Sequence, residues 1–187
     1  MVEPLQRNDT SAQIGASKAP CGGFAKGMSK LLASPGTSTL VQWRVIVPSE
    51  NGTCKIRLST GKLLGQTRLG IDDEQHFMTL FPQDRSADSS GKFECGRHAG
   101  AHETKTVSLP ADISCEKCTL QLIWTTPSGA YYSCSDVTLM SEKIKQCIGK
   151  CHNDGVCVNG VCVCNEPYFG TYCEQTRNHS SLLYSST

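Results

Sequence analysis

The feature that most constrains this chain is a run of six cysteines near its end. They stand at Cys147, Cys151, Cys157, Cys162, Cys164 and Cys173. A zinc site would favour two Cys-x-x-Cys pairs or a mixed cysteine and histidine set, whereas this run contains a Cys-x-Cys step and a single histidine, His152. Because so short a segment buries too little apolar surface to fold alone, it needs covalent cross-links. We therefore predict disulfides here, not metal ligands.

The composition of the whole chain points to the same environment. Its 187 residues include 12 cysteines, a density typical of secreted proteins because cytosolic thiols are kept reduced. Three glycosylation sequons, at Asn8, Asn51 and Asn178, agree with a secreted or cell-surface location. The net charge of +1 gives no electrostatic reason to expect nucleic acid as a partner. No apolar run approaches the ~20 residues of a membrane-spanning helix.

The cysteine-rich stretch resembles the EGF-like domain over residues 147–174. That family ends with Cys-x-Cys, five residues, glycine, two residues and cysteine; here Gly170 is the glycine and Phe169 the typical aromatic before it. The resemblance implies the disulfides Cys147–Cys157, Cys151–Cys162 and Cys164–Cys173. The acidic motif of calcium-binding members is absent ahead of Cys147, so no calcium is expected.

Before residue 140 the chain alternates apolar and polar residues in short runs. Such runs, typical of half-buried strands, cover 39–47, 54–59, 76–81, 104–110, 118–124 and 131–139. In the first of them, Val41, Trp43, Val45 and Val47 share one face. Turn residues at 125–129 predict a hairpin between the last two runs, and Asn159-Gly160 predicts another. The one plausible helix covers 22–32.

These elements predict an all-β chain. We expect a disulfide-stapled antiparallel β-sandwich over residues 1–140, a linker at 141–146, the EGF-like domain at 147–174 and a disordered tail at 175–187.

Six further cysteines belong to the predicted sandwich. They are Cys21, Cys54, Cys95, Cys115, Cys118 and Cys134, and all 15 pairings remain open from sequence. The hairpin would make Cys134 a natural partner for Cys115 or Cys118. Cys115-x-x-Cys118 could also be a redox motif or half a zinc site. Structural disulfides are favoured, because no βαβ pattern surrounds it and no second Cys-x-x-Cys occurs.

Four segments of this first part together resemble the lytic polysaccharide monooxygenase superfamily, which includes the chitin-binding type-4 domains. They are 19–23, 91–96, 115–124 and 129–139. The resemblance covers roughly residues 1–140 and implies a β-sandwich, copper as cofactor, and chitin or another cell-wall glycan as partner. In active members, the amino-terminal histidine and a second histidine hold the copper.

The positions of the two copper histidines differ in how the sequence accounts for them. The opening MVEPLQR, with Pro4 and Arg7, looks like the continuation of a family amino terminus, so the first histidine would precede Met1. A start codon assigned too late would remove both this histidine and the signal peptide; alternatively, the signal was removed. Candidates for the second ligand are His76, His98 and His102. Solvated surface histidines are the competing interpretation.

Two residues of the segment 129–139 match the family further. Tyr131 falls where the family places its axial aromatic residue, and Asp136 matches an acid of the same motif. A tyrosine that packs the sandwich and an aspartate that satisfies backbone amides are equally adequate accounts.

Other enzyme signatures do not occur: there is no serine-hydrolase elbow, phosphate loop or zinc-protease motif. We therefore expect a secreted or cell-surface protein without catalytic residues, whose sandwich binds glycan or copper and whose EGF-like unit is a spacer or contact module. Two alternatives stay open. One is a copper-dependent polysaccharide monooxygenase that has lost its amino-terminal histidine, and the other is an adhesion or matrix protein that binds extracellular proteins.

Overall fold

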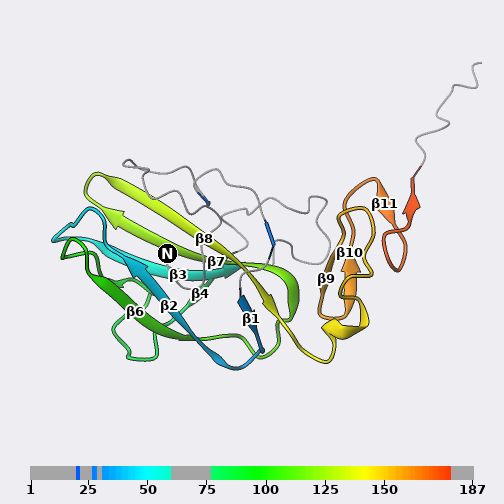
Figure 1. Cartoon of the computed structure of the whole chain (residues 1–187), viewed down its shortest axis with the longest axis horizontal. Helices are drawn as coiled ribbons and strands as arrows, with labels where there is room; N and C mark the ends of the chain where they lie inside the picture. The colour runs from blue at the N-terminus through cyan, green and yellow to red at the C-terminus, as the bar shows by residue number, and fades with distance from the viewer. Residues whose placement is uncertain (1–19, 22–26, 29–30, 60–76, 178–187) are drawn as a thin grey trace, which may run out of the picture.

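The architecture is known from a computed structural model that describes residues 20–21, 27–28, 31–59 and 77–177 (Figure 1). The elements in chain order are β1 (Leu31–Ala33), β2 (Ser38–Arg44), β3 (Thr53–Ser59), β4 (Met78–Leu80), β5 (Phe93–Glu94), β6 (His102–Ser108), β7 (Cys115–Thr126), β8 (Gly129–Leu139), the 3₁₀ helix η2 (Ile144–Gln146), β9 (Val156–Val158), β10 (Val161–Val163), β11 (Tyr168–Phe169) and β12 (Gln175–Thr176). No α-helix occurs in these described residues, and the all-β prediction is confirmed. They also contain no helix long and apolar enough to cross a membrane.

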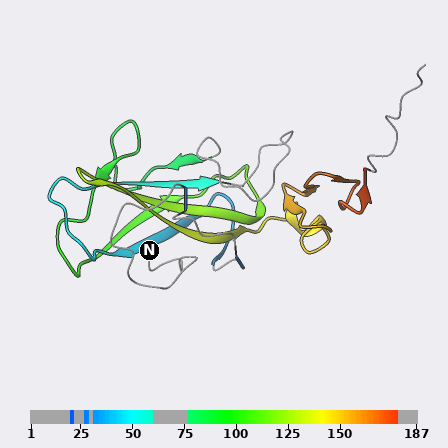
Figure 2. The ribbon, with the colours of Figure 1, turned by 90° about the horizontal axis from the view of Figure 1, so that it is seen from above.

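Two sheets face each other across one apolar core. β2 and β6 form an antiparallel pair, while the larger sheet runs in the order β1-β8-β7-β3-β4. Val41 of β2 and Val107 of β6 belong to the same buried cluster as Ile56 of β3 and Leu120 of β7. This packing is a β-sandwich, as predicted. Figure 2 shows that the molecule is elongated, with β9–β12 beyond one end of the sandwich.

The alternation of the sequence predicts most strand faces correctly. In β3, Cys54, Ile56 and Leu58 are buried. Of the residues predicted to face the core, Val41 and Trp43 of β2 are buried, as is Val45 just after it. Val47, however, is 47% exposed. The prediction for Val47 is wrong because β2 ends at Arg44 and the chain bends away from the sheet.

The predicted helix over 22–32 is wrong where the structure describes it. Leu31 and Leu32 belong to β1, which pairs in parallel with β8. Tertiary pairing with β8 has overridden the local preference, a common outcome because helix propensities are small. Gly27 and Met28 are not helical either, and the other residues of that range lie outside the described part.

Both predicted hairpins are confirmed. β7 and β8 pair antiparallel up to Thr126 and Gly129. β9 and β10 pair around Asn159 and Gly160, whose φ angles are 49° and 91°. Positive φ at both central residues defines the turn that matches the twist of a two-residue hairpin.

All twelve cysteines are disulfide-bonded. The sandwich contains Cys21–Cys134, Cys54–Cys95 and Cys115–Cys118. The expectation that Cys134 joins Cys115 or Cys118 is wrong. Cys134 lies opposite Gln121 in the β7–β8 ladder, on the face turned from the core, whereas Cys118 lies opposite the buried Val137. Neighbouring strand residues point to opposite faces, so Cys134 cannot meet Cys118.

The cysteine-rich part contains Cys147–Cys157, Cys151–Cys162 and Cys164–Cys173, the pairing that the EGF-like resemblance implies. Its end is more ordered than expected, because Gln175 and Thr176 form β12 against β11. Residues 178–187 of the predicted tail lie outside the described residues.

The cysteine-rich part is joined firmly to the sandwich. Val158 of β9 pairs with Cys115 of β7, and Val158 belongs to the main core cluster. The side chain of Asn159 accepts hydrogen bonds from Ser114 N–H at 2.7 Å and Ser114 Oγ at 3.0 Å. Within the predicted linker, Ile144 is fully buried. We call this contact region the junction; the domain boundaries at 141–146 stay a prediction.

Candidate functional site

Three described candidates, His98, His102 and Tyr131, belong to segments that meet at the end of the sandwich farthest from β9–β12 (Figure 1). The loop 45–52, the loop 95–101 and the turn between β7 and β8 meet there, and we call this region the distal end. Val45 N–H donates to the Ala101 carbonyl at 2.9 Å, and Gly100 N–H donates to the Val45 carbonyl at 2.7 Å. These backbone hydrogen bonds hold the two loops side by side.

Glu103 holds the loop 95–101 in place through its side chain. Its carboxylate accepts hydrogen bonds from Trp43 Nε1 at 2.8 Å and from Gly96 N–H at 2.9 Å. The Cys54–Cys95 disulfide adds a covalent tie at the same place. Sequence reasoning missed Glu103, and no motif marks it. The glycine after Cys95 was the one sequence feature that pointed to a special backbone at this position. The structure explains it, because Gly96 has a φ of +75°, which favours glycine.

An aromatic pair lies at the edge of the distal end. The rings of Trp124 and Tyr131 face each other across β7 and β8 with centroids 5.0 Å apart, and both side chains are half-buried. Trp124 Nε1 is buried without a hydrogen-bond partner. It is crowded by backbone, because a Cβ on Gly52 or Gly96 would come within 2.7 Å or 2.6 Å of this nitrogen. Tyr131 therefore packs on Trp124, and its axial role stays a prediction.

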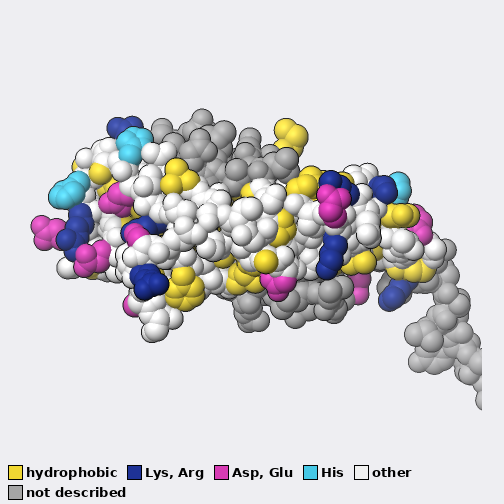
Figure 3. Space-filling model, turned by 90° about the horizontal axis from the view of Figure 1, so that it is seen from below, with side chains coloured by type: hydrophobic (Ala, Val, Ile, Leu, Met, Phe, Trp, Pro, Cys, Tyr) yellow, Lys and Arg dark blue, Asp and Glu magenta, His cyan; other side chains and the backbone are white. Residues whose placement is uncertain are grey.

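The two described histidine candidates are both exposed. His98 lies in the loop 95–101, and His102 begins β6 opposite Arg44. Figure 3 shows histidine side chains on the surface at this end of the sandwich, beside charged ones. His76, the third candidate, lies outside the described residues. The exposure of His98 and His102 agrees with the interpretation of solvated surface histidines.

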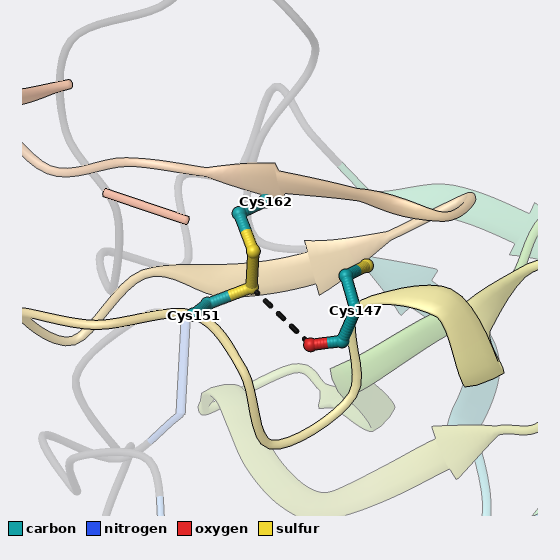
Figure 4. Close-up of side chains that lie close together, drawn as sticks. All are labelled: Cys147, Cys151 and Cys162. Carbon is teal, nitrogen blue, oxygen red and sulfur yellow. Dashed lines mark hydrogen bonds between the residues drawn. A yellow bond between two sulfur atoms is a disulfide. The ribbon is translucent and has the colours of Figure 1, made fainter. Parts of the chain in front are cut away.

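The described residues do not supply a set of copper ligands. The one group of three close metal-donor side chains among them is Cys147, Cys151 and Cys162 (Figure 4). Cys147 is bonded to Cys157, and Cys151 to Cys162. Disulfide sulfurs are not the thiolates that bind metals. Among the described residues, no group of three close donor side chains is therefore available for the copper that the monooxygenase resemblance implies, and the candidate ligand His76 lies outside these residues.

Apolar and charged side chains complete the distal surface. Ile46 is 62% exposed, next to the exposed Val47. Arg97 Nη2 pairs with Glu94 Oε2 at 2.6 Å, but an exposed ion pair of this kind adds little to stability. The distal end thus combines aliphatic and polar groups on loops with aromatic groups on the ends of β7 and β8.

Asp136 belongs to a different place, the outer face of β8. Its carboxylate accepts a hydrogen bond from Gly27 N–H at 2.8 Å and is almost fully buried. Nearby, Gln121 Nε2 donates to the Pro20 carbonyl at 2.6 Å, and Cys21 is bonded to Cys134. Asp136 therefore satisfies the backbone amide of Gly27. It does not line the distal end.

Comparisons with known proteins return the two resemblances seen in the sequence. No protein-family model matches the chain. Protein glp-1 of Caenorhabditis elegans is 41% identical over 51 residues, which are 27% of this chain and 4% of that protein. This short match fits an EGF-like domain.

The similar solved structures are lytic polysaccharide monooxygenases. An AA15 enzyme from Thermobia domestica in the Cu(I) state is 21% identical, with a TM-score of 0.48, and the match covers 60% of this chain and 63% of that one. An AA10 enzyme from Streptomyces lividans is 18% identical, with a TM-score of 0.43 and 58% of each chain covered. The catalytic domain of Lmo2467 from Listeria monocytogenes is 14% identical, with a TM-score of 0.44, covering 62% and 64%. This chain thus spans less than two thirds of each of these proteins.

Proposed function

We propose that this chain is an extracellular glycan-binding protein that uses the distal end and has no catalytic activity of its own. One observation carries the proposal: the fold brings the Trp124–Tyr131 pair, the exposed His98 and His102, and the exposed Ile46 to the same end of the sandwich.

The chemistry of that end suits a sugar polymer. Binding sites for small organic groups combine apolar and aromatic surface with a few polar groups that fix orientation. A tyrosine offers an apolar face and a hydroxyl, both of which a sugar ring can use. Tyr131 is half-buried against Trp124, so its ring is held in place before a ligand arrives. Less side-chain freedom is then lost on binding.

The disulfides support the extracellular part of the proposal. All twelve cysteines are cross-linked, a state that persists in oxidising compartments and is rare in the cytosol. Copper is left out of the proposal, because the one group of three close donor side chains among the described residues consists of disulfide-bonded cysteines.

A pull-down on insoluble chitin and cellulose tests the proposal. The full chain is made in a bacterial periplasm, where disulfides form and N-glycans are not added. We expect Tyr131→Ala to weaken binding about tenfold, the effect of losing a binding-site aromatic. Tyr131→Phe, which keeps the ring, should bind almost as tightly as the unaltered chain.

Tyr168→Ala is the matched control, since Tyr168 is also half-buried but lies in β11 of the cysteine-rich part. It should leave binding unchanged. Equal weakening by Tyr131→Ala and Tyr168→Ala, or no retention on any glycan, would reject the proposal and favour a protein partner.

A further inference from the structure

Asn51 lies in a tight turn of the distal end. Gly52 N–H donates to the Ser49 carbonyl at 3.0 Å, which closes a four-residue turn with Asn51 in the third position. The Asn51 side chain is exposed. Asn51-Gly52-Thr53 is an N-glycosylation sequon. Two further sequons, at Asn8 and Asn178, lie outside the described residues.

The turn is held against the proposed binding surface. Ser49 N–H donates to the Gly96 carbonyl at 2.7 Å, and Cys95 N–H donates to the Gly52 carbonyl at 3.2 Å. Gly52 is so close to Trp124 that an added Cβ would lie 2.7 Å from Trp124 Nε1. Asn51 is therefore one residue from the backbone that packs on the Trp124–Tyr131 pair, and it cannot move away independently of the loop 95–101.

A sugar chain on Asn51 would occupy the space in front of the distal end. An N-linked glycan is bulky and hydrated. Its covalent attachment keeps it at a high effective concentration beside the loop 45–52, which carries Ile46, and close to Trp124, which Gly52 approaches. A broad insoluble polysaccharide needs an unobstructed approach to the same surface, so a glycan on Asn51 would compete with it for that space.

We propose that a fraction of the secreted molecules carries an N-linked glycan on Asn51 and that this glycan blocks polysaccharide binding at the distal end of those molecules. The blocking of polysaccharide binding rests on the proposed function above.

In the modification, Asn51 Nδ2 bonds to the anomeric carbon of an oligosaccharide carried by a lipid diphosphate. The bond from that carbon to the diphosphate oxygen breaks, the diphosphate leaves with the electron pair, and one amide proton is released.

The test uses the full chain secreted from eukaryotic cells. Mass spectrometry of glycopeptides measures the occupancy of Asn51, and particulate chitin and cellulose serve as binding probes. We expect Asn51 to be occupied in a fraction of the molecules, and Asn51→Gln to bind at least about tenfold more tightly than that occupied fraction. Thr53→Ser, which retains the sequon, should still yield an occupied fraction that binds weakly. Asn178→Gln, which removes another sequon, should not restore binding.

The outcomes separate this inference from the proposed function. An unmodified Asn51 overturns the inference and leaves the proposed function standing. An occupied chain that binds as tightly as Asn51→Gln would also overturn the inference without affecting the proposed function. If Asn51→Gln is folded by circular dichroism yet binds neither glycan, the proposed function fails, and the blocking role fails with it.

Discussion

The two ends of the sandwich differ in how their polar and apolar groups are satisfied. At the junction, Val158 is buried in the main core, and Asn159 accepts hydrogen bonds from Ser114 N–H and Oγ. At the distal end, Ile46 is exposed and Trp124 Nε1 has no hydrogen-bond partner. Stability is concentrated where contacts are buried and complete, whereas binding surfaces lie on loops held by a rigid scaffold.

This difference changes the expected role of the cysteine-rich part. A flexible spacer would contact the sandwich little and move independently. The junction instead continues the core and the hydrogen bonding of β7 into β9. We infer that the cysteine-rich part is a rigid extension of the sandwich, on the side away from the distal end.

The largest expected effect is the loss of core contacts at the junction. Ile144→Ala removes a fully buried side chain that packs with Cys147 and Cys157. It should lower the free energy of unfolding by about 2–5 kcal/mol. Ile46→Ala, at the exposed distal position, should change it by less than about 0.5 kcal/mol. Urea unfolding without reductant measures both, and equal effects would remove the contrast between the ends.

A smaller effect is expected from a methyl group added inside the distal end. Gly96→Ala would place its Cβ 2.6 Å from Trp124 Nε1, at φ +75°. Gly100→Ala has a similar φ of +78° but meets nothing within 4 Å. Backbone strain should therefore cost about 1 kcal/mol at Gly100, and overpacking should raise the cost at Gly96 to about 3 kcal/mol.

Thermal unfolding followed by tryptophan fluorescence compares the two variants. Only Gly96→Ala should also change the emission of the folded state, because it displaces the Trp124 ring. Equal losses of stability at Gly96 and Gly100 would mean that the space beside Trp124 is not tightly filled.

The hydrogen bonds of Asn159 should contribute less than the burial of Ile144. Asn159→Gly keeps the positive φ but removes the acceptor for buried Ser114. We expect a loss of about 1–2 kcal/mol, the cost of an unsatisfied buried donor. Asn159→Asp is the matched control, because it retains the acceptor oxygen. Denaturant titration should place Asn159→Asp close to the unaltered chain.

The smallest effect concerns a surface carboxylate between the two ends. The side-chain hydrogen bond from Lys105, followed by those from Ser86, lowers the pKa of Asp84 from 3.8 to about 2. A lowered folded-state pKa stabilises the protein above pH 3.8, and this contribution is lost as the pH falls towards 2. Because Asp84 is exposed, the effect should be small and should weaken with added salt.

Asp84→Asn should therefore be slightly less stable than the unaltered chain at pH 7, with the difference vanishing near pH 2. Thermal unfolding across this range at low and high salt measures it. A difference that grows as the pH falls would contradict the assignment of the pKa to the Lys105 contact.

The sequence by itself determined the features that depend on neighbouring residues. Alternation alone placed Ile56 and Leu58 in the core, and Asn159-Gly160 set the β9–β10 turn, because strand faces and turn angles follow from local geometry. At the candidate site, the family resemblance named Tyr131, His98 and His102 as candidates for one copper site, but strand alternation and turn residues alone did not bring them to one end of the sandwich.

Only the tertiary structure decided the long-range partners. It joined Cys134 to Cys21, 113 positions away, and placed Glu103 beneath Gly96. It turned Leu31 and Leu32 into a strand beside β8, and it fused β9 to β7. The physical reason is that these contacts depend on which faces and ends meet once the two sheets close on a shared core. That arrangement is a property of the whole chain, and no local window of residues contains it.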